Sequence, residues 1–241
     1  MTPPVLELRG VSVKGGDRVL LNGLDLAIGP GERVVAFGPA GSGKHALLKL
    51  AAGVVAPDAG EVRLGAAAAA LPCPVGYAPN EGGLLNNLTL EQNVILPALY
   101  HRTLEPEAAL ARARAILGEL GVGRDAGRRP ELATAGARRL AHLARALLVE
   151  PALFVLEDPL DDLDAVAAQT VSRLLERLRA ESRTVLLATG SLKPYLDWGG
   201  RFLLVLPGKT RLYAGKEGVL READPAVRVF MEDAWISRKG T

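Results

Sequence analysis

The apolar residues of the chain follow two patterns that predict β-strands. Leu24, Leu26 and Ile28 alternate with other residues before the Pro30-Gly31 turn, as in a strand buried on one face. Three shorter runs are almost wholly apolar, which is typical of strands buried on both faces. These runs are residues 33–37, 152–156 and 184–188.

Two longer segments, 106–120 and 165–180, repeat apolar residues at helical spacing. The first has a proline in its first turn and a glycine just past its end, as helices often do. Shorter helices are predicted at 44–52 and 136–149. The residues expected to face the core are Leu110, Ala113, Leu117 and Leu120 in the first long helix, and Val171, Leu174, Leu175 and Leu178 in the second.

Strands that alternate with helices predict an α/β fold with a mostly parallel sheet. The helical stretch 81–150 interrupts this alternation, so we expect it to be a helical subdomain inserted in the core of a single domain, 1–241. A C-terminal tail is expected at 215–241. The alanine run at 66–70 is too short to be more than a strand edge or a connector.

A glycine-rich loop follows the strand at 33–37. It consists of Gly38, Pro39, Ala40, Gly41, Ser42, Gly43, Lys44 and His45. In phosphate-binding loops, glycines let backbone N–H groups close around a phosphate, a lysine reaches the β- and γ-phosphates, and a hydroxyl ligates Mg²⁺. His45 stands in place of the hydroxyl residue, and imidazole suits this hard ion poorly. The loop therefore predicts a phosphate cradle that lacks part of its metal site.

Composition narrows the class of protein. The 241 residues are 49% hydrophobic and carry 29 basic and 27 acidic side chains, for a net charge of +2. Because the two signs are interspersed, no basic face for nucleic acid is predicted. The pairs Arg128-Arg129 and Arg138-Arg139 are interpreted as solvated faces.

Cysteine content and hydropathy favour a soluble protein of a reducing compartment. Cys73 is the single cysteine, which excludes an internal disulfide, and we interpret it as a buried thiol without a catalytic role. The N-terminus has no signal pattern, and no apolar run reaches the length of a membrane span.

The order of motifs resembles the nucleotide-binding subunit of an ABC transporter over nearly the full chain. Besides the loop at 38–45, the resemblance rests on Gly76-Tyr77-Ala78-Pro79-Asn80, residues 82–89, Ala144-Arg145-Ala146-Leu147, residues 150–159 and Leu163-Asp164. It implies a P-loop NTPase (RecA-like) core with a mostly parallel sheet, an antiparallel β subdomain and an inserted helical subdomain. Within this superfamily, residues 82–97 and 224–230 look like the ATPase subunits of Mce-type phospholipid transporters.

Against the family pattern, several positions that would bind or hydrolyse ATP carry other side chains. No aromatic residue precedes Phe37, so the stacking on adenine, worth about 1–3 kcal/mol, is missing and ATP binding should be weak. Asn80 replaces a glutamine that touches Mg²⁺ and water, and its amide reaches less far. Gly190 falls at the switch histidine and has no side chain for the γ-phosphate.

The carboxylate pair after the strand at 152–156 is reversed to Glu157-Asp158. Side chains alternate along a strand, so Glu157 is expected at the metal position and Asp158 beside the attacking water, each with the wrong length. A shift of about 1 Å can cost on the order of a hundredfold in rate. The signature loop, which would cap the partner subunit's nucleotide, becomes residues 133–137, where Thr134 keeps a hydroxyl and Gly136 one glycine.

The segment from Gly82 to Pro97 would, by the same resemblance, receive the coupling helix of a membrane permease, with Leu84, Leu85, Leu88 and Val94 as apolar contacts. A second nucleotide-binding subunit, identical or different, is also implied, with a location in the cytoplasm on the inner face of the bacterial membrane. We therefore expect a lipid-transporter subunit that docks and holds nucleotide but hydrolyses little.

Two other readings stay open. The chain could be an active ATPase that uses Glu157 as metal ligand and Asp158 as base, or a soluble ABC-type ATPase that acts away from membranes.

Overall fold

The computed structural model describes residues 2–222, 224, 227 and 228 and divides into two compact units. The first unit contains residues 1–65 and 182–241, and the second contains residues 66–181. In the described part of the chain, every helix is too short or too polar to cross a bilayer. Most of the segment 224–230 lies outside the described residues.

The first unit contains an antiparallel sheet in the order β2-β1-β4. Its strands are β1 (Leu6–Gly15), β2 (Arg18–Ile28) and β4 (Ala59–Leu64). Leu24, Leu26 and Ile28 are buried on β2 while the residues between them are exposed, which confirms the half-buried strand predicted from their alternation. This sheet is the antiparallel β part that the resemblance implied.

The remaining strands of the first unit run in the order β7-β3-β8-β9. They are β3 (Arg33–Phe37), β7 (Thr184–Thr189), β8 (Arg201–Leu206) and β9 (Lys209–Tyr213). β3 is parallel to both β7 and β8, whereas β9 is antiparallel to β8. The described part of the unit also contains the helices α1 (Lys44–Ala51) and α7 (Lys216–Leu220), with a short 3₁₀ turn at Lys193–Tyr195. The apolar runs of β3 and β7 are buried almost throughout, as their patterns predict.

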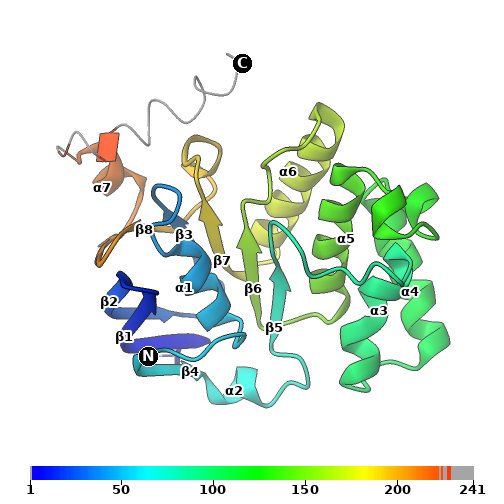
Figure 1. Ribbon diagram of the computed structural model, residues 1–241, viewed down its shortest axis with the longest axis horizontal. Coiled ribbons are helices and arrows are strands. Elements are labelled where there is room, and N and C mark those ends of the chain that lie inside the picture. The colour runs from blue at the N-terminus through cyan, green and yellow to red at the C-terminus, as the bar shows by residue number, and fades with distance from the viewer. Residues whose placement is uncertain (1, 223, 225–226, 229–241) are drawn as a thin grey trace. The chain divides into compact units, whose positions relative to one another are not determined.

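The second unit combines a parallel pair of strands with most of the helices (Figure 1). The strands are β5 (Val75–Ala78) and β6 (Leu153–Glu157), and the helices are α2 (Ala66–Ala69), α3 (Leu90–Tyr100), α4 (Pro106–Glu119), α5 (Ala135–Leu148) and α6 (Ala165–Ala180). Two 3₁₀ turns, Gly123–Asp125 and Pro130–Leu132, lead into α5. α5 packs against α3, α4 and β5, so it is the central helix of this unit.

Close packing between α5 and β5 depends on a glycine. A Cβ atom at Gly76 would lie 2.8 Å from the carbonyl oxygen of Ala146, closer than a real contact allows. The glycine therefore lets the strand approach the helix backbone directly, and it fixes where the residues after β5 lie relative to α5.

The observed elements confirm the predicted α/β fold, with small differences at their ends. The inward face of α6 consists of the four residues expected, Val171, Leu174, Leu175 and Leu178. On α4, Ala109 is buried together with Ala113 and Leu117, whereas Leu110 is half-buried. The alanine run forms the one-turn helix α2 rather than a strand edge, because alanine has the highest helix propensity. Cys73 is half-buried rather than fully buried, and burial raises the pKa of its thiol.

Candidate functional site

The phosphate loop of the first unit has a backbone that only glycine accommodates at two points. Gly38 has φ +150°, and a Cβ atom there would lie 2.1 Å from the carbonyl oxygen of Val205. Gly43, which precedes α1, has φ +108°, and its Cβ would lie 2.9 Å from the carbonyl oxygen of Leu20. These close approaches hold the loop against the backbone of Val205 and Leu20. Gly43, as the N-cap, also provides no side-chain cap for the start of α1. Uncapped N–H groups at a helix N-terminus attract anions.

Two side chains in this loop fit a phosphate group. Lys44 Nζ donates to the carbonyl oxygens of Gly38 and Pro39, at 2.6 and 2.8 Å, so the ammonium folds back over the loop. Ser42 is 1% exposed, and its hydroxyl is the one buried side-chain polar atom without a hydrogen-bond partner among the described residues. A buried hydroxyl that lacks a partner costs free energy, which a phosphate oxygen would recover. His45, in contrast, is exposed and offers no oxygen ligand for Mg²⁺.

Gly190 leaves the same edge of the sheet as the phosphate loop. β3 and β7 run parallel with Phe37 opposite Thr189, so Gly38 and Gly190 follow on neighbouring strands. Gly190 is exposed, and a Cβ atom added there would meet nothing within 4 Å. A Cβ atom at this position would therefore fit without any change in the backbone.

In the second unit, Asn80 follows β5 and Glu157 is the last residue of the neighbouring strand β6, and Ala78 of β5 pairs with Leu156 of β6. Glu157 Oε2 accepts hydrogen bonds from the backbone N–H of Asn80 at 3.2 Å and from the Tyr77 hydroxyl at 3.3 Å. Burial, followed by the charge of Glu157, raises the pKa of Tyr77, so its hydroxyl stays protonated and donates. One carboxylate oxygen of Glu157 is thus engaged by the chain's own donors.

Asp158 lies just past the end of β6, the strand whose alternation was expected to extend to it. β6 ends at Glu157, and Asp158 has φ +40°, in the left-handed region that non-glycine residues rarely adopt. Its carbonyl oxygen accepts from the backbone N–H of Asp161 at 3.0 Å, so the chain turns here. The alternation of side chains along a strand therefore does not extend to Asp158, and its role beside the attacking water stays a prediction.

Thr134 and Gly136 lie at the start of α5. Thr134 is the N-cap of this helix, and its hydroxyl accepts from the backbone N–H of Ala137 at 3.1 Å. Gly136 packs near α6, where a Cβ atom would lie 3.6 Å from the Cβ of Ala167. The exposed Thr134 thus stands at a helix N-terminus, as the signature loop would require.

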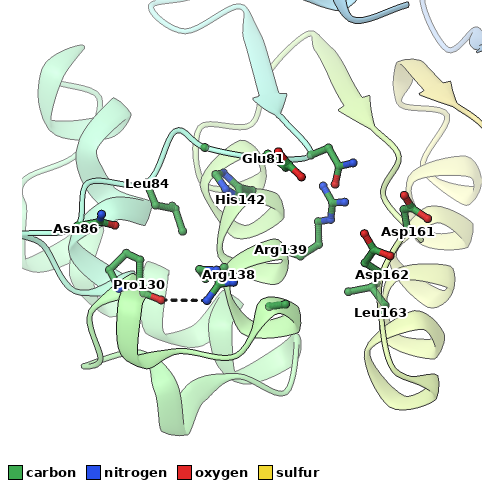
Figure 2. Close-up of a pocket in the computed structure, with 13 residues that line it drawn as sticks. Glu81, Leu84, Asn86, Pro130, Arg138, Arg139, His142, Asp161, Asp162 and Leu163 are labelled. Carbon is green, nitrogen blue, oxygen red and sulfur yellow. Dashed lines mark hydrogen bonds between the residues drawn. The ribbon is translucent and has the colours of Figure 1, made fainter. Parts of the chain in front are cut away.

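A cavity of about 390 Å³ opens in the second unit beside Asn80 (Figure 2). It is lined by the residues that follow β5, by the first turns of α5 and by the acidic residues after β6. Figure 2 shows Arg138 directed toward Pro130, whose carbonyl oxygen accepts its hydrogen bond at 3.3 Å. Asp161 and Asp162 border the cavity on the side of α6. The cavity therefore carries charges of both signs.

Arg139 contradicts the interpretation of Arg138-Arg139 as a solvated pair. It is 6% exposed, and its Nη1 donates to the carbonyl oxygens of Pro79 and Glu157, at 3.2 and 3.3 Å. A guanidinium carries five donors, so it can be buried where carbonyl oxygens are available. Sequence reasoning missed this residue because a pair of arginines on a helix is usually solvated.

The segment 82–97 is held by a residue that the sequence did not reveal. Asn93 is 0% exposed; its Oδ1 accepts from the N–H of Leu85 at 2.7 Å, and its Nδ2 donates to three carbonyl oxygens, including that of Leu85. Leu85 itself is 51% exposed, as a docking contact would be. Val94 is 0% exposed, so its assignment to the partner surface is wrong. It belongs to the buried core at α3 instead.

Comparison with known proteins identifies the family. A model of the ABC transporter family matches residues 21–161. The lipoprotein-releasing system ATP-binding protein LolD of Pseudomonas syringae pv. tomato is 37% identical over 179 residues, which cover 70% of this chain and 78% of LolD. The macrolide export ATP-binding/permease protein MacB 1/2 of Paracoccus denitrificans is 35% identical over 200 residues. That match covers 77% of this chain and 30% of MacB.

Further matches agree. The aliphatic sulfonates import ATP-binding protein SsuB 1 of Burkholderia cenocepacia is 36% identical over 207 residues, 85% of this chain and 62% of SsuB. Among solved structures, a dimeric ATP-binding cassette in a post-hydrolysis state with ADP and Pi superposes with a TM-score of 0.75 at 24% identity, over 86% of this chain and 97% of that one. A nucleotide-free cassette from an ABC transporter gives 0.77 at 19% identity, over 94% and 98%. The chain belongs to the ABC transporter family, through the ATP-binding domain of that family.

Proposed function

We propose that this chain is the ATP-binding subunit of an ABC transporter and that it holds nucleotide weakly while hydrolysing little or none. The observation that carries this proposal is the contrast within the site. The phosphate cradle is formed, with Lys44 over the loop and the Ser42 hydroxyl without a protein partner among the described residues. The side chains that would bind metal, activate water and contact the γ-phosphate are replaced or displaced.

Weak hydrolysis is supported by four positions. His45 offers no hydroxyl, and Gly190 offers no side chain. Glu157 has an oxygen engaged by Tyr77 and Asn80, and Asp158 lies past the end of β6 in a left-handed conformation. Phosphoryl transfer depends on positioning and charge stabilisation, so each of these changes is expected to lower the rate of hydrolysis.

For the cargo, we propose a lipid or phospholipid handled by an Mce-type transporter. The support is the sequence of residues 82–97 and 224–230, together with a relative whose name assigns it to lipoprotein release. In this proposal the segment 82–97 docks on a membrane permease at the inner face of the cytoplasmic membrane. A second nucleotide-binding subunit completes the assembly, as in the solved structures of dimeric cassettes.

Steady-state phosphate release by the purified protein, together with calorimetric titration of ATP, tests the catalytic part of the proposal. We expect measurable ATP binding that is lost in Lys44→Ala, and a turnover close to the background of that variant. Robust hydrolysis by the wild type, abolished by Lys44→Ala, would overturn the proposal in favour of an active ATPase that uses Glu157 and Asp158.

Docking is tested separately by co-purification with the permease. Leu85 is exposed, so Leu85→Glu should leave the free energy of unfolding within about 0.5 kcal/mol of the wild type. As an apolar anchor of an interface it should cost about 2 kcal/mol or more of binding, enough to release the permease. Tyr100→Glu, at a more exposed position just outside the segment, is the matched control. Retention of the permease by Leu85→Glu would contradict the assignment of this docking surface, whereas a wild type that co-purifies with no permease would favour a cassette that acts away from membranes.

A further inference from the structure

Three basic residues of α5 lie along one face of the helix and contact the segment that follows β5. Arg139, His142 and Arg145 are spaced three residues apart, so their side chains leave neighbouring turns on the same side. Arg139 Nη1 donates to the carbonyl oxygen of Pro79 at 3.2 Å, and Arg145 Nη1 donates to the carbonyl oxygen of Gly83. The two guanidinium groups therefore hold both ends of the segment 79–83, which contains Asn80.

His142 connects these contacts. Its Nδ1 lies 3.2 Å from Nη2 of Arg145. A guanidinium only donates hydrogen bonds, so Nδ1 must be the acceptor and the ring carries its proton on Nε2. Burial, then the charges of Arg145 and Arg139, lower the pKa of His142 to about 3, which agrees with a neutral ring. His142 thus orients the guanidinium of Arg145 toward Gly83.

The segment approaches these side chains closely because Gly83 lacks a Cβ atom. An added Cβ would lie 3.3 Å from Nη2 of Arg145 and 3.6 Å from Cε1 of His142, and Gly83 has φ +76°. At the other end, Arg139 also donates to the carbonyl oxygen of Glu157, and Asn80 donates to the Glu157 carboxylate. The segment is therefore attached to α5 at both ends and to β6 at one.

We propose that Arg139, His142 and Arg145 are positioning residues that latch the segment 79–83 onto α5, and that His142 does so as a hydrogen-bond acceptor for Arg145. The latch sets the place of Asn80 and of the entry to the segment 82–97. The roles of Asn80 and of the segment 82–97 in nucleotide and permease binding rest on the proposed function. The latch itself is measured without nucleotide or permease. Loss of ATP binding would thus overturn the proposed function and leave the latch intact.

Amide hydrogen exchange in the nucleotide-free protein tests the latch, because the N–H groups of Asn80 and Leu85 are hydrogen-bonded to Glu157 and Asn93 and report local opening. His142→Leu removes the acceptor and should speed exchange at both amides by about tenfold or more, the effect of losing a charge-assisted bond. His142→Asn supplies an amide oxygen near the Nδ1 position and should restore exchange to within about threefold of the wild type. The Leu47 amide, bonded to Gly43 in the first unit, should stay unchanged in both variants.

Two further variants keep the test decisive. Arg138→Ala removes a guanidinium from the same helix that contacts Pro130 and Ala133 instead, so it should not speed exchange at Asn80. Arg145→Lys keeps the charge but lacks the planar fork whose two nitrogens contact Gly83 and His142, so it should speed exchange at Asn80 and Leu85. It tests the latch independently if His142→Leu does not fold. Unchanged exchange in Arg145→Lys, equal acceleration in His142→Asn and His142→Leu, or the same acceleration in Arg138→Ala would each overturn the proposal.

Discussion

The phosphate loop of the first unit is built from backbone, whereas the region around Asn80 and Glu157 in the second unit is built from side chains. Gly38 and Gly43 shape the loop through positive φ angles and close contacts with Val205 and Leu20. Around Asn80, in contrast, every contact depends on the length and protonation of a carboxylate, a phenol or a guanidinium. A site made of backbone groups keeps its shape when a neighbouring side chain differs, as at His45. A site made of side chains changes its chemistry when one of them is longer or shorter by a single methylene.

The comparison predicts its largest effect at Gly38. Gly38→Ala should destabilise the protein by more than about 4 kcal/mol or remove ATP binding entirely, because its Cβ would overlap the carbonyl oxygen of Val205. Gly41→Ala is the matched control: φ is +73° but nothing lies within 4 Å, so about 1–2 kcal/mol is expected. Urea unfolding and ATP titration measure both. Equal costs for the two variants would mean that the close contact at Gly38 does not shape the loop.

The buried histidine of the second unit should make the free energy of unfolding fall at acidic pH. His142 stays neutral in the folded protein down to a pKa of about 3, whereas the unfolded chain takes up the proton below about pH 6.5. The unfolded state then binds more protons, so stability falls as the pH falls from about 6.5 toward 3. Between pH 7 and 5 this amounts to about 2 kcal/mol. Urea unfolding at both pH values should show a smaller loss in His142→Asn; an identical loss would contradict the assignment.

Restoring the side chains should raise turnover only when they are restored together. The combined variant His45→Thr, Glu157→Asp, Asp158→Glu and Gly190→His should raise phosphate release about tenfold or more, whereas Asp158→Glu alone should recover almost nothing, because catalytic groups that act as a unit are not additive. A Cβ atom at position 190 would meet nothing within 4 Å. Recovery by Asp158→Glu alone would show that the other three positions do not limit the rate.

The smallest expected effect concerns Mg²⁺. Because His45 supplies no oxygen ligand, the affinity for ATP should change by less than about threefold when Mg²⁺ is added. Calorimetric titration with and without the ion measures this, and His45→Thr should increase the dependence. Strong tightening of ATP binding by Mg²⁺ in the wild type would show that another group replaces the hydroxyl.

The sequence predicted the elements of this fold well where burial is uniform along an element. β3 and α6 have the predicted ends, because a regular series of apolar residues is buried along the length of each element. Prediction failed where a single partner decides the outcome. Val94 was assigned to the surface although it belongs to the buried core at α3, and Arg139 was assigned to solvent although two carbonyl oxygens bond it.

The candidate site shows the same limit. The glycines and lysine of the loop follow a spacing that the sequence displays directly. The left-handed turn at Asp158 and the capture of Glu157 by Tyr77 depend on where β6 ends, which no local pattern records. Asn93 was missed for a similar reason, since an asparagine inside a helix gives no sign that it binds four backbone groups.

The open surroundings of Gly190 make this position suitable for an optical sensor. It follows β7, next to the point where the phosphate loop follows β3, and a Cβ atom added there would meet nothing within 4 Å. A fluorophore attached through Gly190→Cys would sit next to an incoming phosphate without replacing any group of the loop. With Cys73 half-buried as the one competing thiol of the chain, such labelling would give a direct readout of nucleotide occupancy in the assembled transporter.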